Sequence, residues 1–281
     1  MDSLPDLRRR IRSVQSTRKV IRAMEMISGA RLRRAQQYAA ATRPYTEELR
    51  RIICRIASSG ACSDPVLEPR ETRHRALVVM SSDKGLCGGF NSSVTDKALE
   101  VAGLEPGDDR VITIGKRCRD RFPQADPEVS GEMGGRPDQR KAAKLTIKVM
   151  GMFRAGEVDQ VDIVYNSYRG GRPSDPVVET ILPVIRPESV PGCGEEGETI
   201  FDPSAEEVLA DAFPRYVTSM ILSAMAESLA SEHSARLASM AAAGSNADEM
   251  IERLKLQRNK LRQSSITREI TELVGGAGAP Q

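Results

Sequence analysis

Apolar and small residues recur at alternating steps of four and three along both ends of the chain, and this spacing constrains the fold more than any other feature. The first run starts at Leu7 and ends at Ile56, and the second starts at Ala226 and ends at Ser265. Steps of four and three average 3.5 residues, which is the period of a coiled coil. Two long helices that pack along a shared seam are therefore predicted.

At 1.5 Å per residue the two helices would be roughly 80 and 100 Å long. Helices of that length cannot bury themselves within one globule, so we expect them to pair as a left-handed antiparallel coiled coil. Proline removes a backbone donor, so a kink is predicted at Pro44 and a bend or break at Pro214. Small residues such as Gly244 would let the two helices approach closely.

The middle of the chain alternates short apolar runs with helical stretches, which is typical of α/β structure. The strand candidates are Ala76–Ser81, Val111–Gly115, Val161–Tyr165 and Val177–Ile185. The helix candidates are Ser92–Ala102 and Asp138–Phe153, and the predicted loops are 58–75 and Pro187–Thr199. We therefore predict α/β plus α: a small Rossmann-like α/β domain, residues 76–200, inserted between coiled-coil helices at 1–57 and 204–281.

Composition excludes several function classes. The chain carries 41 Lys+Arg against 39 Asp+Glu, so it is no bulk polycation that binds nucleic acid by charge alone. With 4% aromatic residues and no Trp, it is no stacking platform for single strands. Two His and five scattered Cys without zinc spacing predict no metal site and, in a reducing compartment, inert thiols. No stretch approaches the roughly 18–20 apolar residues of a membrane helix, so direct membrane insertion is not expected.

The segment Ser81–Asn91, SSDKGLCGGFN, follows a predicted strand and precedes a predicted helix, where a phosphate loop would lie. It matches neither GxGxxG nor GxxxxGK[ST]. A structural turn is favoured, with glycines at positive φ and Ser92 or Asn91 as the helix N-cap. Its turn residues are Lys84, Gly85, Gly88 and Gly89. Nucleotide binding at Lys84, or an activated thiol at Cys87, would make the chain an enzyme instead.

Three features suggest other roles along the helices. Residues 8–34 hold ten basic residues and one acidic residue, which favours a solvated face or a docking stripe for an acidic surface. The C-terminal stretch Leu254–Ala279 ends in an apolar tip, which implies a partner that surrounds it. His233 falls on the second run, so we expect it to be packed and hydrogen-bonded rather than a ligand.

Three separated segments resemble the gamma subunit of F-type ATP synthases. Near the start this is IRSVQSTRKVIRAMEMISGARLRRAQ (Ile11–Gln36) followed by TRPY, and in the middle it is the turn SSDKGLCGGFN. Near the end it is LASEHSARLASM (Leu229–Met240) and RNKLRQSSITREITELVGGA (Arg258–Ala277). The resemblance runs end to end in order and spacing, and the joint occurrence of all three segments is specific.

The resemblance implies a central rotor shaft without a catalytic site or cofactor, turned by ion flow inside a ring of three alpha and three beta subunits. The α/β domain would contact the epsilon subunit and the membrane c-ring, at the cytoplasmic face of a bacterial inner membrane. The implied beta-subunit contacts are Arg8, Arg9, Lys19, Arg22, Met24, Arg262, Gln263 and Thr267. The implied sleeve residues are Ile270, Leu273 and Val274. From the residues alone, a coiled-coil adaptor, a nucleic-acid binder or an enzyme using Lys84 and Cys87 remain alternatives.

Overall fold

The structure is a computed structural model that describes residues 3–62, 64–67, 73–102, 110–126, 131–169, 172–184 and 200–277. The chain divides into two compact units, one made of Met1–Ser28 with Leu237–Gln281, the other of Gly29–Arg236. Two long helices, α1 (Leu4–Ser59) and α4 (Ala205–Ala277), each contribute to both units. The first unit is therefore built from the two ends of the chain.

Within the first unit the two helices pair in antiparallel fashion. Leu7 and Ile11 are buried with Leu254 in one apolar cluster. Further along, Arg18 donates a hydrogen bond to Asp248 at 2.9 Å. The residues that meet rise in number along α1 and fall along α4, so the predicted antiparallel pair is confirmed.

Every described position of the two predicted runs is buried or half-buried, in both units. In the second unit the run includes Ile53 and Ile56, both fully buried in the main core. A hydroxyl pair, Thr46 and Ser219 at 2.5 Å, lies within the same interface. The break predicted at Pro214 is wrong, because α4 begins at Ala205 and continues through it. The buried side chains around this proline offset the one backbone hydrogen bond that it cannot donate.

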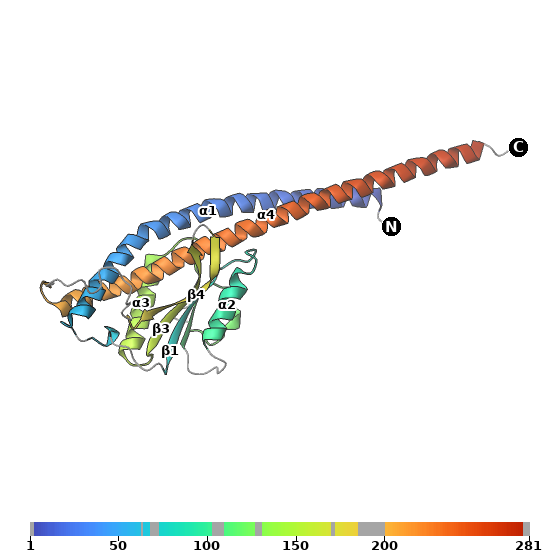
Figure 1. Ribbon diagram of the computed structural model, residues 1–281. Coiled ribbons are helices and arrows are strands. Elements are labelled where there is room, and N and C mark those ends of the chain that lie inside the picture. The colour runs from blue at the N-terminus through green and yellow to red at the C-terminus, as the bar shows by residue number, and fades with distance from the viewer. Residues whose placement is uncertain are drawn as a thin grey trace. The chain divides into compact units, whose positions relative to one another are not determined.

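The rest of the second unit is a four-stranded sheet covered on both faces (Figure 1). Its strands are β1 (Arg75–Met80), β2 (Arg110–Ile114), β3 (Gln160–Arg169) and β4 (Arg172–Leu182). The order is β2-β1-β3-β4, with β1 parallel to both neighbours and β4 antiparallel to β3. The α/β fold class is thereby confirmed, with one antiparallel strand at the edge.

Alternating residues of β1 separate the two faces of the sheet. Leu77 and Val79 pack against the helix α2 (Phe90–Val101). Val78 and Met80 pack against α3 (Gln139–Arg154) and the long helices, in the largest core of the chain. One face of the sheet is thus buried under α2, and the other under α3 and the root of the helix pair, by which we mean the parts of α1 and α4 that belong to the second unit (29–59 and 205–236).

The hairpin β3–β4 departs from the prediction. The strand predicted at Val177–Ile185 begins five residues earlier and ends at Leu182. The added part of the strand contains two prolines, Pro173 and Pro176, which pair with β3. A proline is tolerated because β4 is an edge strand whose outward amides need no partner. Within the predicted loop 58–75 lies a short 3-10 helix, Pro65–Leu67, and the predicted loop Pro187–Thr199 lies outside the described residues.

The cysteines also depart from expectation at one position. Cys54 is disulfide-bonded, so the prediction of five inert thiols is wrong there. Cys62, Cys87 and Cys118 are free, and the last two are buried. Cys193 lies outside the described residues.

Candidate functional site

Basic residues outnumber acidic residues in the first unit. It contains thirteen Lys and Arg against eight Asp and Glu, whereas acidic residues prevail in the remainder of the chain. The predicted contact residues Arg8, Arg9, Lys19 and Arg22 are all exposed on α1. The Ser3 hydroxyl and the Arg9 guanidinium hold the pKa of Asp6 below its usual value. This face is suited to an acidic partner surface.

Two exposed apolar residues of α1 lie next to Met24, the apolar contact residue that was predicted. Met24 is half-buried, next to the seam positions Glu25 and Ser28. Met26 is 65% exposed and Ile27 is 53% exposed. Side chains two positions apart point to different sides of a helix, so Met26 points away from α4 while Met24 lies beside the seam. The spacing of the run therefore distinguishes Met26 from Met24.

Near the end of α4 the three predicted contacts Arg262, Gln263 and Thr267 are exposed. The Thr267 hydroxyl donates to the Gln263 carbonyl at 2.9 Å, one helical turn away. Ile266 and Ile270 are 47% and 55% exposed, and their spacing of four places them on one face. The side chains of the predicted sleeve residues Leu273 and Val274 lie outside the described residues. The described end of α4 therefore carries polar contacts and an apolar strip together.

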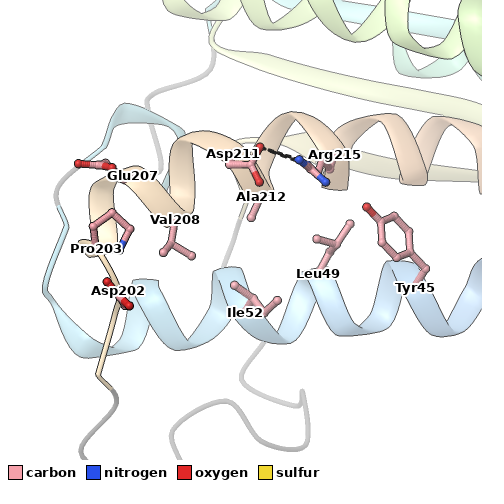
Figure 2. Close-up of a pocket in the computed structure, with 10 residues that line it drawn as sticks. All are labelled: Tyr45, Leu49, Ile52, Asp202, Pro203, Glu207, Val208, Asp211, Ala212 and Arg215. Carbon is pink, nitrogen blue, oxygen red and sulfur yellow. Dashed lines mark hydrogen bonds and ion pairs between the residues drawn. The ribbon is translucent and has the colours of Figure 1, made fainter.

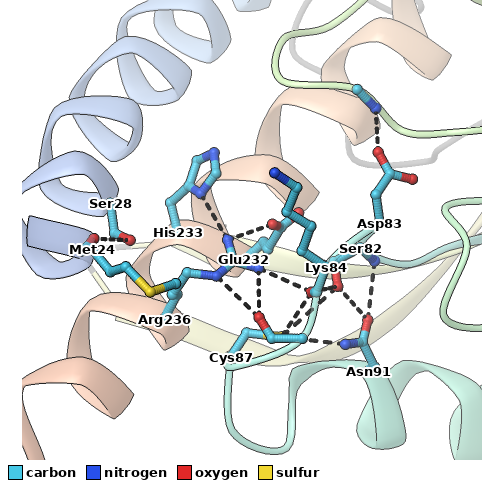
Figure 3. Close-up of polar contacts among 12 residues, drawn as sticks. Met24, Ser28, Ser82, Asp83, Lys84, Cys87, Asn91, Glu232, His233 and Arg236 are labelled. Atoms are coloured by element: carbon cyan, nitrogen blue, oxygen red, sulfur yellow. Dashed lines mark hydrogen bonds and ion pairs between the residues drawn. The ribbon is translucent and has the colours of Figure 1, made fainter. Parts of the chain in front are cut away.

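A buried arginine on α4 binds the glycine turn, and sequence reasoning missed it (Figure 3). Arg236 is 6% exposed. Its Nη2 donates to the carbonyls of Lys84 at 3.0 Å and Gly85 at 3.1 Å, and its Nε donates to Gly85 at 3.2 Å. Backbone carbonyls carry no sequence signal, so no motif could have identified this contact.

Two neighbours on α4 complete this cluster. The Arg236 Nη1 donates to the Glu232 carboxylate at 2.6 Å and lies 3.3 Å from Nδ1 of His233. Burial, together with Arg236 and Arg31, lowers the pKa of His233 to about 4. The imidazole is thus neutral at pH 7 and accepts at Nδ1, as the prediction of a packed, hydrogen-bonded histidine requires. Burial raises the pKa of Glu232, against the opposing effect of Arg236.

The turn itself differs in detail from the prediction. Among the predicted turn residues only Gly88 has positive φ, and the other positive value belongs to Leu86. Gly89 is the N-cap of α2, in place of Ser92 or Asn91, and it makes no side-chain cap. The Asn91 carboxamide instead closes the turn: its oxygen accepts from the Ser82 amide and its nitrogen donates to Cys87.

The two groups proposed for chemistry in this turn do not form a site. Lys84 is exposed, whereas Cys87 is 1% exposed and packs beneath the turn. The Cys87 sulfur lies 3.8 Å from the Lys84 carbonyl, so it is the backbone of Lys84 that it contacts. A thiol placed in this way is a packed residue rather than an accessible nucleophile.

A groove of about 450 Å³ lies between the last turns of α1 and the first turns of α4 (Figure 2). It is lined by Tyr45, Leu49, Ile52, Asp202, Pro203, Glu207, Val208, Asp211, Ala212 and Arg215. Tyr45 is 50% exposed and Ile52 is 38% exposed. The lining includes three carboxylates and one guanidinium, that of Arg215, which donates to Asp211 at 2.9 Å. The groove is therefore apolar along its wall and acidic at its rim.

Among the described residues, no helix combines the length and apolar character needed to cross a membrane. In the same part of the chain, no group of three or more His, Cys, Asp or Glu could hold a metal ion.

Known proteins resemble this chain over its whole length. A family model described as ATP synthase matches residues 3–279. An ATP synthase gamma chain of Pelotomaculum thermopropionicum is 39% identical over 283 residues, which is 99% of each chain. One from Anaeromyxobacter sp. is 39% identical over 290 residues, also 99% of each. A chain in the cryo-EM structure of the Euglena gracilis mitochondrial ATP synthase has a TM-score of 0.65 at 18% identity and covers 99% of this chain and 97% of its own length.

Proposed function

The chain belongs to the ATP synthase gamma-chain family, and on that premise we propose that it is the rotor shaft of an ATP synthase. It stands inside a ring of three alpha and three beta subunits, which hold the catalytic sites. Ion flow turns the membrane c-ring and, with it, this chain. Its asymmetric faces then drive each beta subunit in turn through its binding states. The observation that carries the proposal is the family match over 99% of the chain.

The first unit supplies the surface for the beta subunits. The exposed Arg8, Arg9, Lys19 and Arg22 contact acidic beta loops, and Met24 with its exposed neighbour Met26 contacts the moving beta lever. On α4, Arg262, Gln263 and Thr267 hydrogen-bond the beta loops. Exposure and polarity support the assignments of the basic and polar residues, because a group that binds a partner must be free of its own chain's core. The assignment of Met24, which is half-buried, is supported by the exposure of its neighbour Met26.

The apolar end of α4 turns within a sleeve formed by the alpha and beta subunits. Ile266 and Ile270 are the described members of that surface, and Leu273 and Val274 extend it. A bearing of this kind needs apolar contacts, which are non-directional and cost little when the shaft slides past them.

The α/β domain, residues 76–200, and the root of the helix pair contact the epsilon subunit and the c-ring. The groove at that root, with its apolar wall and acidic rim, is the surface we assign to a basic loop of the ring. We place the protein peripherally, at the cytoplasmic face of a bacterial inner membrane, as part of a proton-translocating complex.

Reconstitution tests the proposal. The purified chain is mixed with the alpha and beta subunits of its source, and the mixture is analysed by size exclusion and ATP hydrolysis. A complex of three alpha, three beta and one copy of this chain with azide-sensitive ATPase supports the rotor role. Folded alpha and beta subunits that fail to assemble with this chain would contradict it.

Substitution of Arg262 and Gln263 by Ala tests the contacts on α4. We expect the complex to assemble but coupled ATP synthesis to fall, because the beta loops lose their hydrogen bonds. Arg253→Ala is the matched control, since Arg253 is an exposed arginine of α4 that pairs with Glu249 on its own helix. Equal synthesis rates in both variants and the parent would contradict the assignment.

A further inference from the structure

The position of Arg236 in the chain indicates a mechanical role for the cluster that it forms with Glu232, His233 and the glycine turn. It is the last residue of the second unit, and from Leu237 onward α4 belongs to the first unit. Both α1 and α4 continue from the second unit into the first, and a rotation of the α/β domain that is carried by α4 passes along the helix at this point. The contact that Arg236 makes is therefore the one nearest to the point where the helix leaves the domain.

The guanidinium uses all three of its nitrogens in this contact. Nε and Nη2 donate to the turn carbonyls of Lys84 and Gly85, and Nη1 donates to the Glu232 carboxylate. The fork is thereby fixed from both sides, by its own helix and by the turn. A planar fork with several donors resists twisting in a way that a single point charge does not.

The turn that receives Arg236 is itself held by the α/β domain. The Ser82 hydroxyl donates to the Lys84 carbonyl at 2.7 Å. The Asp83 carboxylate accepts from the amides of Met133 at 3.0 Å and Gly134 at 2.8 Å. The accepting carbonyls thus belong to a turn that is bonded to β1, α2 and the segment before α3, so a force on the domain reaches them directly.

Most of the remaining attachment of α4 to this unit is apolar, through residues such as Phe213, Val217, Ile221 and Met225. Hydrogen bonds add to it further from the end of the unit: Glu227 accepts from Ser167 and Tyr168 of β3, and the hydroxyls of Thr218 and Thr146 lie 2.9 Å apart. Apolar contacts resist separation but are non-directional, so they oppose rolling of a helix about its axis only weakly. Directional hydrogen bonds at a fixed fork oppose it strongly. We propose that Arg236 is the torque-bearing clamp that makes α4 turn with the α/β domain, an inference that rests on the rotor role proposed above.

The test uses the complete ATP synthase and the variant Arg236→Lys, which keeps the charge but removes the fork. The ratio of ATP synthesis, at a fixed driving force, to ATP hydrolysis by the same complex measures coupling. We expect this ratio to fall about fivefold, because the two charge-assisted carbonyl contacts are lost. Arg31→Lys is the matched control, since Arg31 is an exposed arginine that acts on the same cluster only electrostatically.

A second readout separates a clamp from general loss of structure. A bead is attached to the α/β domain of single complexes whose alpha and beta ring is fixed to a surface. The width of its angular fluctuation should increase in Arg236→Lys and remain at the parent value in Arg31→Lys. A parent-like ratio and width in Arg236→Lys would overturn the clamp, whereas failure of the parent to assemble or rotate would overturn the rotor role.

Ser82→Ala provides an independent variant if Arg236→Lys does not assemble. It leaves Arg236 intact and removes the hydroxyl that holds the Lys84 carbonyl. The ratio and the fluctuation width should move in the same direction by a smaller amount. Parent-like values of both would overturn the proposal.

Discussion

At the scale of single residues, Gly115 shows how closely the end of β2 approaches the end of β1. Its φ is +102°, and a Cβ there would lie 2.1 Å from the Ser81 carbonyl oxygen. Gly115→Ala should therefore lower the free energy of unfolding by about 3 kcal/mol or more, through strain and steric overlap. Urea unfolding followed by circular dichroism measures the change.

Gly135→Ala is the control for this variant, because nothing lies within 4 Å of a Cβ at that glycine and its φ is not positive. It should change the unfolding free energy by less than about 0.5 kcal/mol. Equal effects of the two substitutions would mean that Ser81 is further from β2 than described.

His233 gives the stability of the chain a dependence on pH. Its folded pKa of about 4 lies below its ordinary value of 6.5, so between these values the unfolded chain binds a proton that the folded chain does not. Stability should thus fall as the pH is lowered, by about 2 kcal/mol between pH 7 and 5 from this group. Arg236 and Arg31 reinforce the effect, whereas Glu232, whose pKa is raised, opposes it.

His233→Gln isolates that contribution, because glutamine is neutral at every pH. The loss of unfolding free energy between pH 7 and pH 5 should be about 2 kcal/mol smaller in the variant than in the parent. Parallel pH profiles would show that His233 is not buried next to cations.

Residues at this scale were predictable only where they belong to a repeating pattern. The burial of His233 follows from its place in the four-three run. The role of Arg236 does not, since its partners are two carbonyls about 150 residues away. Leu86 at positive φ was also not predictable, because the glycines beside it are the usual occupants of that conformation.

At the scale of elements, the helix pair leaves room at one of its small residues. Gly244 lies on the seam, and a Cβ there would be 3.9 Å from Ile21 Cγ2, an ordinary contact distance. Gly244→Ala should therefore stabilise α4 by roughly 0.5–1 kcal/mol, which is the helix preference of alanine over glycine. Thermal melting followed at 222 nm measures it.

Gly151→Ala in α3 is the reference, because a Cβ there has no neighbour within 4 Å. It should give a similar gain without any contact to a second helix. A loss at Gly244 beside a gain at Gly151 would mean that α1 and α4 approach more closely than described.

Most of the helices and strands could be predicted from the sequence. Both long helices, three of the four strands and the two short helices lie within a few residues of their predicted bounds. The exception is β4, whose first five residues, two of them prolines, were not predicted. Prolines are tolerated in β4 because it is an edge strand, and a sequence pattern does not tell which strand lies at the edge of the sheet.

At the scale of the whole molecule, the uneven distribution of charge bears on assembly. Basic residues exceed acidic ones in the first unit, whereas acidic residues prevail elsewhere. If the first unit docks on acidic beta loops, association should slow roughly tenfold when Arg8 and Arg9 are replaced by Glu, and added salt should reduce the difference. Stopped-flow association with the alpha and beta subunits at low and high salt measures this.

Charge reversal at Arg110 and Arg154, both exposed in the second unit, controls for net charge alone. It should leave the association rate within about twofold of the parent. The same slowing in both double variants would point to overall charge rather than to a docking face.

The hydrogen bond from Arg18 to Asp248 joins residues 230 positions apart, and this separation has a consequence during synthesis. At roughly 5–20 residues per second, the ribosome reaches Asp248 about 12–45 s after it has added Arg18. For that interval the N-terminal half of α1 carries an apolar seam whose partner has not yet been made. The yield of soluble chain should therefore depend on translation speed and on chaperones that cover this seam, even when the finished protein is stable.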